Sequence, residues 1–390
     1  MTKAIIVGAG MGGLAAAVAL HQQGVEVDVH EQARALREVG AGLTLSSGAL
    51  KSLYSLGLLD AARSVSQVSA RVPFVHYQTA RLLSGEFEND AADQAVATDN
   101  PFVSRHIFRA DLQDVLAREW QARRPGALHL GHALVAFAQD DSGVTATFAN
   151  GHSARADFLI GADGLHSAVR TALWGAARPS FTGQVAWRFL VDGVLARPHM
   201  SSGRAAVFLG PDRVFNRYLL RSGALLNCVA IVRMPGWQGE GWSTPGDPQE
   251  LAALFEGWHA DVRALIALAQ PGHLVKWALG VRPALPTWQD RRVAVLGDAA
   301  HPMLPFLGLG AAMALEDAVI LGRAFAVEGA PQAALARYEA ARRPRATAVA
   351  EASASQGLAL QAQDPDHFSS HPSPPANRAW FDYEPAAVPL

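Results

Sequence analysis

The most restrictive feature of the sequence is a glycine-rich segment between an apolar run and an Ala-rich stretch. Residues 3–7 form a β-branched run that suits a buried parallel strand, and residues 14–23 have the composition of a helix. Gly8 permits a tight turn, Gly10 permits close approach of a pyrophosphate, and Gly13 permits close packing of the helix on the strand. The spacing therefore predicts a strand–turn–helix unit whose helix N-terminus binds the phosphates of a dinucleotide.

A carboxylate follows this unit at the expected distance. Residues 25–30 read as a second strand, and Glu31 stands eighteen residues after Gly13. A carboxylate there can accept hydrogen bonds from both ribose hydroxyls, each worth roughly 1.5–3 kcal/mol, and it disfavours a 2′-phosphate. The alternative, a glycine turn without function, does not explain why strand, helix and acid all occur at this spacing.

Two acidic motifs occur later in the chain, each directly after an apolar run. The first is Gly-Ala-Asp-Gly at residues 161–164, and the second is Gly-Asp-Ala-Ala-His-Pro at residues 297–302. In the second motif, Asp298 at a strand end can bind polyol hydroxyls. The amides that open the next helix, near Gly310, can stabilise negative charge on a reduced ring. Together with the glycine segment, these motifs predict one flavin dinucleotide bound along its whole length.

Composition excludes several classes of protein. The chain has 390 residues, 33 basic against 35 acidic, and a net charge of −2 without a basic block, so nucleic-acid binding is not expected. The single cysteine, Cys228, excludes an internal disulfide and a cysteine metal cage, and its apolar surroundings predict a core strand position. Neither the N-terminus nor the apolar residues 303–326 have the pattern of a signal peptide or a membrane span. We expect a cytoplasmic protein, monomeric or homodimeric, that binds no membrane.

The order of strand-like and helix-like segments predicts an α/β fold with a discontinuous Rossmann-type domain. From about residue 181 to residue 281 the sequence changes to strand-like runs separated by turns, and afterwards a parallel-strand pattern and helices return. The dinucleotide-binding domain is expected to comprise residues 1–75, 100–178 and 282–330. An inserted β-sheet domain for the substrate is expected at residues 76–99 and 179–281, followed by a C-terminal helix and tail at 331–390.

With these motifs in place, the chain resembles the class A flavoprotein monooxygenases, the FAD-dependent aromatic-ring hydroxylases. Within them it is similar to the branch that contains salicylate hydroxylase and 6-hydroxynicotinate 3-monooxygenase. The resemblance covers nearly the whole chain and implies the class A hydroxylase fold. Besides the three motifs, it rests on residues 40–42, 109–112, 186–188, 313–318, 342–345 and 379–383.

The resemblance implies the residues that bind FAD. Arg109 would face the pyrophosphate, Leu134 the adenine, and Asp298 the ribityl chain, while Asp163 lies in a motif that touches both FAD and NAD(P)H. As an alternative, Arg109 is an exposed helix arginine without a ligand. The full set of implied cofactor-binding residues is Gly8, Gly10, Met11, Gly12, Gly13, Glu31, Gln32, Arg109, Leu134, Asp163, Asp298, Gly310, Ala311, Ala312 and Met313.

The resemblance also implies the reaction. NADH or NADPH, bound transiently, would reduce FAD, and a flavin C4a-hydroperoxide would insert one oxygen atom from O2 into a small aromatic or heteroaromatic substrate. Pro305 matches a family proline beside the flavin and would help to shield this hydroperoxide. Tyr218 would orient the substrate through its hydroxyl or, alternatively, serve only in packing.

Three positions depart from the family pattern. The histidine that usually precedes the tyrosine by four residues is Val214, a frequent glutamine is Leu309, and a histidine of the nicotinate-type enzymes is Thr44. An apolar pocket provides no buried base. We therefore expect a substrate that is ionised before it binds or that needs no deprotonation, such as an amino-substituted ring.

The sequence also offers candidate substrate-binding residues and alternative reactions. Arg188, Arg217 and Arg282 are candidate partners for a substrate carboxylate, because guanidinium groups make bidentate contacts. Alternative functions are oxidation of a natural-product ring and a flavoprotein reductase or redox protein without oxygen insertion. A flavin-dependent halogenase is disfavoured, because the sequence contains no Trp-x-Trp-x-Ile-Pro segment.

Overall fold

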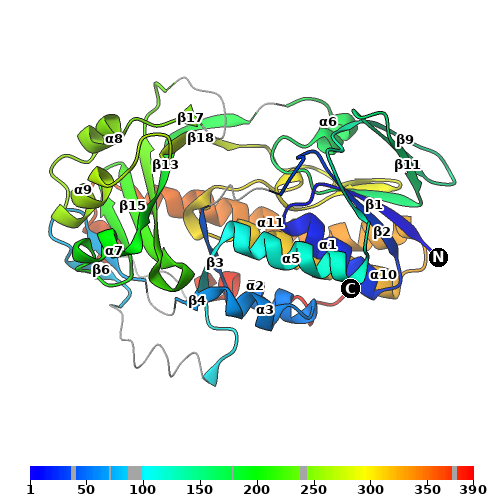
Figure 1. Cartoon of the computed structure of the whole chain (residues 1–390), viewed down its shortest axis with the longest axis horizontal. Coiled ribbons are helices and arrows are strands. Elements are labelled where there is room, and N and C mark those ends of the chain that lie inside the picture. The colour runs from blue at the N-terminus through cyan, green and yellow to red at the C-terminus, as the bar shows by residue number, and fades with distance from the viewer. Residues whose placement is uncertain (37–40, 70–71, 87–98, 178, 238–243, 371–375) are drawn as a thin grey trace.

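The computed structural model shows two large β-sheets toward opposite ends of the long axis, with long helices between and behind them (Figure 1). It describes residues 1–36, 41–69, 72–86, 99–177, 179–237, 244–370 and 376–390. Within these ranges, no helix combines the length and apolar character that a membrane crossing requires. The α/β fold class expected from the sequence is confirmed.

The first sheet is the Rossmann-type sheet. Its order is β19-β20-β12-β1-β2-β8, and all neighbouring strands are parallel except the β19–β20 pair. The strands are β1 (Lys3–Val7), β2 (Glu26–Glu31), β8 (Leu128–Leu130), β12 (Phe158–Gly161), β19 (Gln289–Asp290) and β20 (Val293–Val295). A separate antiparallel sheet contains β9 (Leu134–Gln139), β10 (Val144–Phe148) and β11 (Ser153–Ala156).

Helix α1 (Met11–Gln22) is buried along most of its length. It packs against α10 (Gly310–Val327) and α5 (Arg109–Arg123), which explains why it is apolar on nearly all sides. A small sheet of β3 (Gly42–Leu45), β7 (Arg105–Phe108) and β4 (Ser66–Val68) lies between the two large sheets. The shorter helices of this half of the molecule are α2 (Ser47–Ser55), α3 (Leu59–Ser64) and α6 (Ala168–Trp174).

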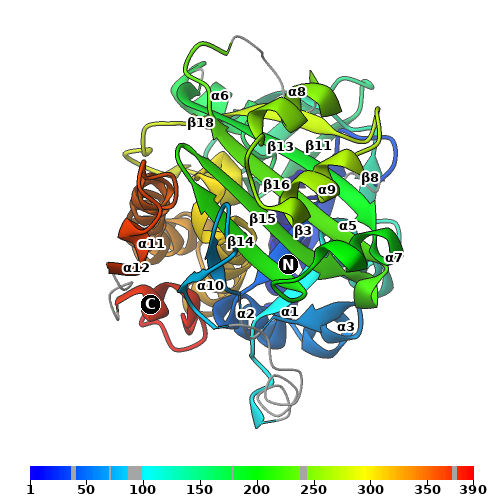
Figure 2. The same cartoon turned by 90° about the vertical axis from the view of Figure 1, so that its left-hand side faces the viewer.

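The second large sheet has the order β17-β18-β13-β16-β15-β14-β5-β6. Its neighbours are antiparallel, apart from the parallel β14–β5 pair. Helices α8 (Pro248–Leu254) and α9 (Ala260–Ala267) cover its outer face (Figure 2). The strands are β5 (Phe74–His76), β6 (Leu82–Ser84), β13 (Ser180–Asp192), β14 (Ala205–Gly210), β15 (Arg213–Leu220), β16 (Leu225–Arg233), β17 (Thr244–Pro245) and β18 (Val275–Val281).

Two details bear on the predicted domain boundaries. Strand β5 begins at Phe74, so two residues of this sheet precede the predicted boundary at residue 76. Residues 87–98 of the predicted 76–99 segment lie outside the described residues.

Successive side chains of β13 point to opposite faces of the second sheet. Trp187 and Phe189 pack in the apolar cluster under α8 and α9, together with Cys228 of β16. Ala186 points the other way and packs against Leu304 of the Rossmann-type half. Because side chains alternate along a strand, Arg188 also faces the Rossmann-type half.

A buried ionic network joins α10 to the long helix α11 (Pro331–Leu360). The Asp317 carboxylate accepts a hydrogen bond from the Gly297 amide at 2.9 Å and from Arg342 Nε at 2.7 Å. His301 Nε2 lies 2.6 Å from the same carboxylate. These contacts fix the loop of the second acidic motif onto two helices.

Neighbouring residues extend the network to the C-terminal segment. Glu316 pairs with Arg342 at 2.9 Å and accepts a hydrogen bond from Arg345 Nε at 2.8 Å. The Arg345 guanidinium lies 3.7 Å from the ring centre of Tyr383, and its Nη2 donates to the Trp380 carbonyl. The late segments on which the family resemblance rests therefore meet in one structural unit. The remaining short helices are α7 (Gly193–Ala196), α12 (His367–Ser370) and α13 (Ala376–Phe381).

Replacing Asp317 by Asn is expected to lower the free energy of unfolding by about 3–5 kcal/mol, because it leaves Arg342 buried without its full countercharge. Urea unfolding at pH 7 measures the change. Asp60→Asn is the control, because the Asp60 side chain is 97% exposed in its contact with Arg63. An Asp317→Asn loss no larger than that of the control would contradict the expected role.

The same residue predicts a pH dependence. Burial alone would raise the pKa of Asp317, but His301 and Arg342 outweigh it and lower the pKa from 3.8 to about 2. Because the pKa of Asp317 is lower in the folded than in the unfolded protein, its carboxylate stabilises the fold at pH values above the unfolded-state pKa. This stabilisation is lost as the pH falls from about 4 toward 2. Across this pH window, the free energy of unfolding should change less with pH for Asp317→Asn than for the wild type.

Candidate active site

The three sequence motifs lie at one edge of the Rossmann-type sheet. Strand β12 pairs with β1 on one side and with β20 on the other, and Gly161 is the register partner of both Val7 and Val295. Each of these strands leads into one motif. Because the carboxyl ends of neighbouring parallel strands share an edge, segments separated by up to about 290 residues come together.

The glycines of the first motif differ in what surrounds them. A Cβ added to Gly8 would lie 2.4 Å from the Ala162 carbonyl oxygen, and one added to Gly13 would lie 2.0 Å from the Gly8 carbonyl oxygen. A Cβ on Gly12 would lie 2.7 Å from the Leu296 side chain. Gly10 is the N-cap of α1, and a Cβ there would meet no atom within 4 Å. Packing of the protein therefore explains three of these glycines but not Gly10.

Glu31 is fixed at the end of β2 by the backbone around it. Its Oε2 accepts from the Ala9 amide, and its Oε1 accepts from the Ala33 amide, each at 2.8 Å. Gln113 of α5 donates to the Ala9 carbonyl at 2.8 Å, a contact that the sequence did not predict. Gln32 is exposed beside Glu31.

Other predicted cofactor residues lie around this turn. Met11 is the first residue of α1, and Arg109 is an exposed residue at the start of α5. Leu134 opens β9 and packs against the core of the Rossmann-type half.

The two motif aspartates have different environments. Asp163 Oδ2 accepts hydrogen bonds from the amides of Ala168 and Val169 at 2.7 and 3.2 Å. Its Oδ1 is buried without a hydrogen-bond partner among the described residues, and burial raises its pKa despite the bonds to Oδ2. Asp298 lies exposed in a short 3-10 turn, Gly297–Ala299.

The N-terminus of α10 adjoins this region. A Cβ on Gly310 would meet no atom within 4 Å, whereas Ala311, Ala312 and Met313 are buried. Pro305 is exposed in a 3-10 turn, Pro305–Leu307. Leu309, which was expected in the substrate pocket, is only 2% exposed and packs in the core of the Rossmann-type half.

The second sheet presents Tyr218 and Arg188 on the face that turns toward the Rossmann-type half. Tyr218 packs with Phe108 of β7, where the second sheet contacts the small sheet. Arg217 precedes it on β15, is fully buried, and donates to the Gly203 carbonyl at 2.7 Å. Neighbouring residues of a strand point to opposite faces, so Arg217 points away from the face that carries Tyr218.

A histidine from another element packs on Tyr218. The His106 ring of β7 stacks on the Tyr218 ring with 4.0 Å between ring centres, and its Nε2 lies 2.9 Å from Ser69 Oγ. Burial lowers the pKa of His106 to about 3 and raises the pKa of Tyr218 above its usual value. Both groups are therefore uncharged at neutral pH. No spacing in the sequence indicated this contact between distant strands.

Arg188 has an unusual environment for a cation. It is half-buried, lies over the Trp277 ring at 5.2 Å, and has no ion-pair partner among the described carboxylates. Burial lowers its pKa, and the nearby Arg109 lowers it further.

Asn227 of β16 lies on the same face of the second sheet as Arg188 and Tyr218. Its Oδ1 accepts from the Gly42 amide at 2.9 Å, while its Nδ2 is buried without a partner among the described residues. Of the other predicted pocket residues, Val214 is buried in an apolar cluster with Leu360, and Thr44 is half-buried in β3.

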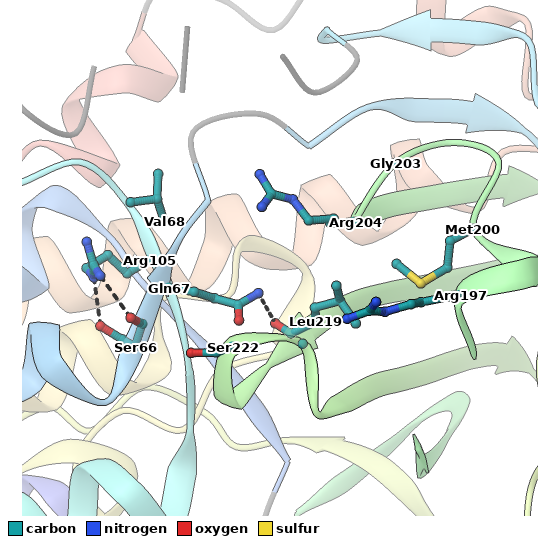
Figure 3. A pocket seen from close by; sticks show the side chains of 11 residues that line it. Ser66, Gln67, Val68, Arg105, Arg197, Met200, Gly203, Arg204, Leu219 and Ser222 are labelled. Atoms are coloured by element: carbon teal, nitrogen blue, oxygen red, sulfur yellow. Dashed lines mark hydrogen bonds between the residues drawn. The ribbon is translucent and has the colours of Figure 1, made fainter. Parts of the chain in front are cut away.

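A cavity of about 830 Å³ lies elsewhere, between the small sheet and the second sheet (Figure 3). Arg105, Arg197 and Arg204 line it, and Gln67 donates to the Leu219 carbonyl at 2.8 Å on its wall. Leu219 belongs to the cluster under α8 and α9, and none of the lining residues belongs to the three motifs. This cavity is therefore distinct from the site that the motifs form.

Sequence and structure comparisons identify the family. The model of the FAD binding domain family matches residues 1–353. The chain is 34% identical over 359 residues to 3-amino-4-hydroxybenzoate 2-monooxygenase of Streptomyces platensis, covering 90% of this chain and 87% of the relative. It is 31% identical over 372 residues to 6-hydroxynicotinate 3-monooxygenase of Bordetella bronchiseptica, covering 93% of each.

A solved structure supports the same grouping. Klebsiella pneumoniae HpxO, in complex with FAD and uric acid, superimposes with a TM-score of 0.85 at 26% identity, covering 100% of this chain and 98% of the other. The α/β architecture, the three assembled motifs and these relatives agree. The chain belongs to the FAD-binding class A aromatic hydroxylases and is an FAD-dependent aromatic monooxygenase.

Proposed function

We propose that this enzyme uses NADH or NADPH to insert one oxygen atom from O2 into a small aromatic or heteroaromatic ring that carries an ionised carboxylate. The observation that carries this proposal is the half-buried Arg188, which faces the Rossmann-type half without an acidic partner among the described residues. A partly desolvated guanidinium without a countercharge favours an anionic ligand.

The unfilled positions of the site fit FAD. Gly10 and Gly310 both leave open space at a helix N-terminus, where amides and the helix dipole favour phosphate groups and a negatively charged ring, respectively. Asp163 Oδ1 is a buried acceptor that has no partner in the described part of the chain, and Asp298 is exposed for polyol hydroxyls. Glu31 would bind the ribose.

The remaining residues of the proposed cofactor site follow from the same arrangement. Met11, Gly12 and Gly13 supply the first turn of α1, and Arg109 supplies a positive charge near the phosphates. Gln32 and Leu134 would lie toward the adenosine half, and Ala311–Met313 toward the ring. Bound FAD, reduced by the nicotinamide, supplies the activation of O2 and the transfer of one oxygen atom.

The chain's own residues would bind and orient the substrate. Arg188 binds the carboxylate, and Asn227 Nδ2 donates a hydrogen bond to a ring substituent. The raised pKa of Tyr218 keeps its hydroxyl protonated, so it can donate a hydrogen bond but not accept a proton from the substrate. Val214 and the exposed Pro305 would limit access of water to the reacting ring.

The described residues of the site include no evident base for the substrate. The neutral His106 stacks on Tyr218 and contacts Ser69, so its ring is committed to these contacts. Hydroxyl deprotonation by this pair is not expected. An amino group activates a ring without losing a proton, and the relative from Streptomyces platensis is named for an amino-substituted hydroxybenzoate. The substrate class that we propose is therefore an amino-substituted aromatic acid, or a hydroxy-substituted one whose hydroxyl is ionised before it binds.

Coupled turnover tests this function. Purified FAD-loaded enzyme is supplied with NADH or NADPH and with 3-amino-4-hydroxybenzoate, 6-hydroxynicotinate or their carboxamides. Consumption of the nicotinamide and O2, formation of product and formation of peroxide are measured together. We expect stoichiometric hydroxylation of at least one acid and poor turnover of its carboxamide. Consumption that gives only peroxide with every ring compound would instead support a flavoprotein reductase.

Gly10→Ala is expected to raise the dissociation constant for FAD at least about tenfold, which corresponds to about 1.4 kcal/mol. A methyl group at Gly10 contacts no protein atom, so the apoprotein should keep its thermal stability. Gly329→Ala is the matched control, because its Cβ would also meet nothing within 4 Å. Fluorescence titration with FAD measures the affinity. Wild-type affinity in Gly10→Ala would place the cofactor away from this turn.

Arg188→Gln is expected to raise KM for an aromatic acid about tenfold to a hundredfold, because a charge-assisted contact of about 1.5–3 kcal/mol is lost. The KM for the matching carboxamide should change little. Arg233→Gln is the control, because Arg233 lies on the same sheet in an exposed ion pair with Asp212 at 3.2 Å. Equal effects on the acid and the carboxamide would remove Arg188 from carboxylate binding.

A further inference from the structure

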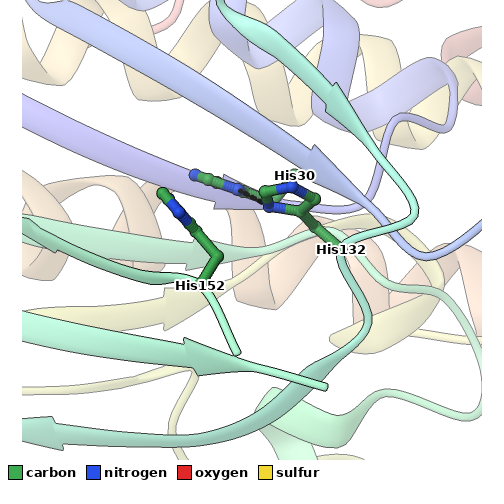
Figure 4. Close-up of side chains that lie close together, drawn as sticks. All are labelled: His30, His132 and His152. Carbon is green, nitrogen blue, oxygen red and sulfur yellow. Dashed lines mark hydrogen bonds between the residues drawn. The ribbon is translucent and has the colours of Figure 1, made fainter. Parts of the chain in front are cut away.

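Three histidines lie together near the carboxyl ends of β2 and β8 (Figure 4). His30 is in β2, His132 follows β8, and His152 lies in the turn between β10 and β11. One ring nitrogen from each lies within 4.8 Å of the others. The cluster therefore joins three chain segments that are distant in sequence.

The closest pair has the spacing of two ligands on one metal ion. His30 Nδ1 lies 3.0 Å from His132 Nδ1. Two nitrogens that each lie about 2.0–2.1 Å from a metal ion are separated by roughly 2.8–3.4 Å at angles between octahedral and tetrahedral. The same distance also suits a hydrogen bond in which one ring donates to the other, so the third histidine is needed to distinguish the two arrangements.

The surroundings favour a built site over a chance meeting of exposed side chains. His30 is 1% exposed, and its Nε2 has no hydrogen-bond partner among the described residues. Its ring stacks on Phe148 at 4.3 Å and on His129 at 4.7 Å. His132 is half-buried and His152 is exposed, so one side of the cluster is open to solvent.

A carboxylate lies just outside the cluster. Asp28 Oδ1 is 3.0 Å from His129 Nε2, and the His129 ring stacks on His30. A nearby negative charge stabilises a bound cation and restrains the rings around it.

We propose that His30, His132 and His152 bind one late first-row divalent cation, with Zn²⁺ as the representative ion. Imidazole ligands suit this class of metal, and three histidines leave at least one coordination position for water. The ion would tie β2 of the Rossmann-type sheet to the β10–β11 turn. None of the three histidines belongs to the three motifs, although the His30 carbonyl accepts a hydrogen bond from the Gly8 amide at 2.7 Å. The proposal does not depend on the proposed substrate.

Metal binding is tested on the untagged, FAD-loaded protein after removal of metal by chelation. Isothermal titration with Zn²⁺ should give one site per chain, and the melting temperature should rise with Zn²⁺ because the ion binds the folded state. With Cu²⁺, the electron paramagnetic resonance spectrum should show coupling to imidazole nitrogens. Absence of a saturable site would overturn the proposal.

His152→Ala is the decisive variant, because this exposed side chain can be removed without disturbing the core. We expect Zn²⁺ affinity to fall at least about tenfold, since loss of even an outer-sphere partner costs a metal site that much. His273→Ala removes an exposed histidine elsewhere and should leave affinity unchanged. His132→Ala provides a second test within the cluster. Unchanged affinity in both cluster variants would overturn the assignment.

Discussion

One buried carboxylate, Asp317, determines how the second acidic motif is presented. It receives the Gly297 amide, His301 and Arg342 at distances of 2.6–2.9 Å, so the loop, α10 and α11 share one anchor. A carboxylate in this position cannot remain ionised unless its partners stay in place. The neighbouring Asp298 is thereby left exposed at a defined position, while Glu316, Asp317 and Arg342 are fully buried. The stability of the fold and the exposed position of Asp298 thus depend on the same charged residues.

The second constraint is the alternation of side chains in the large antiparallel sheet. One face supports α8 and α9 with an apolar cluster, and the other carries Arg188, Asn227 and Tyr218 toward the Rossmann-type half. These three polar side chains thus lie on a face where a ligand can contact them. This arrangement allows a sheet with a continuous apolar core to present polar side chains on its other face.

The sequence predicted the Rossmann-type turn, the acidic motifs and the family, because short-range backbone requirements fix glycine and acid spacing. It did not predict the stacking of His106 on Tyr218, since β7 and β15 meet only through tertiary packing. It named Arg217 as a candidate partner for the substrate, because the sequence does not show which face a residue takes in a strand that is buried on both faces. The histidine cluster was also missed, because its members come from three separate elements.

The position of the single cysteine has a practical consequence. Cys228 is fully buried in the cluster under α8 and α9, and burial raises the pKa of its thiol above the usual value. A thiol in this state is neither ionised nor reachable by reagents in water. A cysteine introduced at an exposed position would therefore be the only thiol of the folded enzyme open to a maleimide probe. The chain is ready for site-specific labelling without prior removal of its own cysteine.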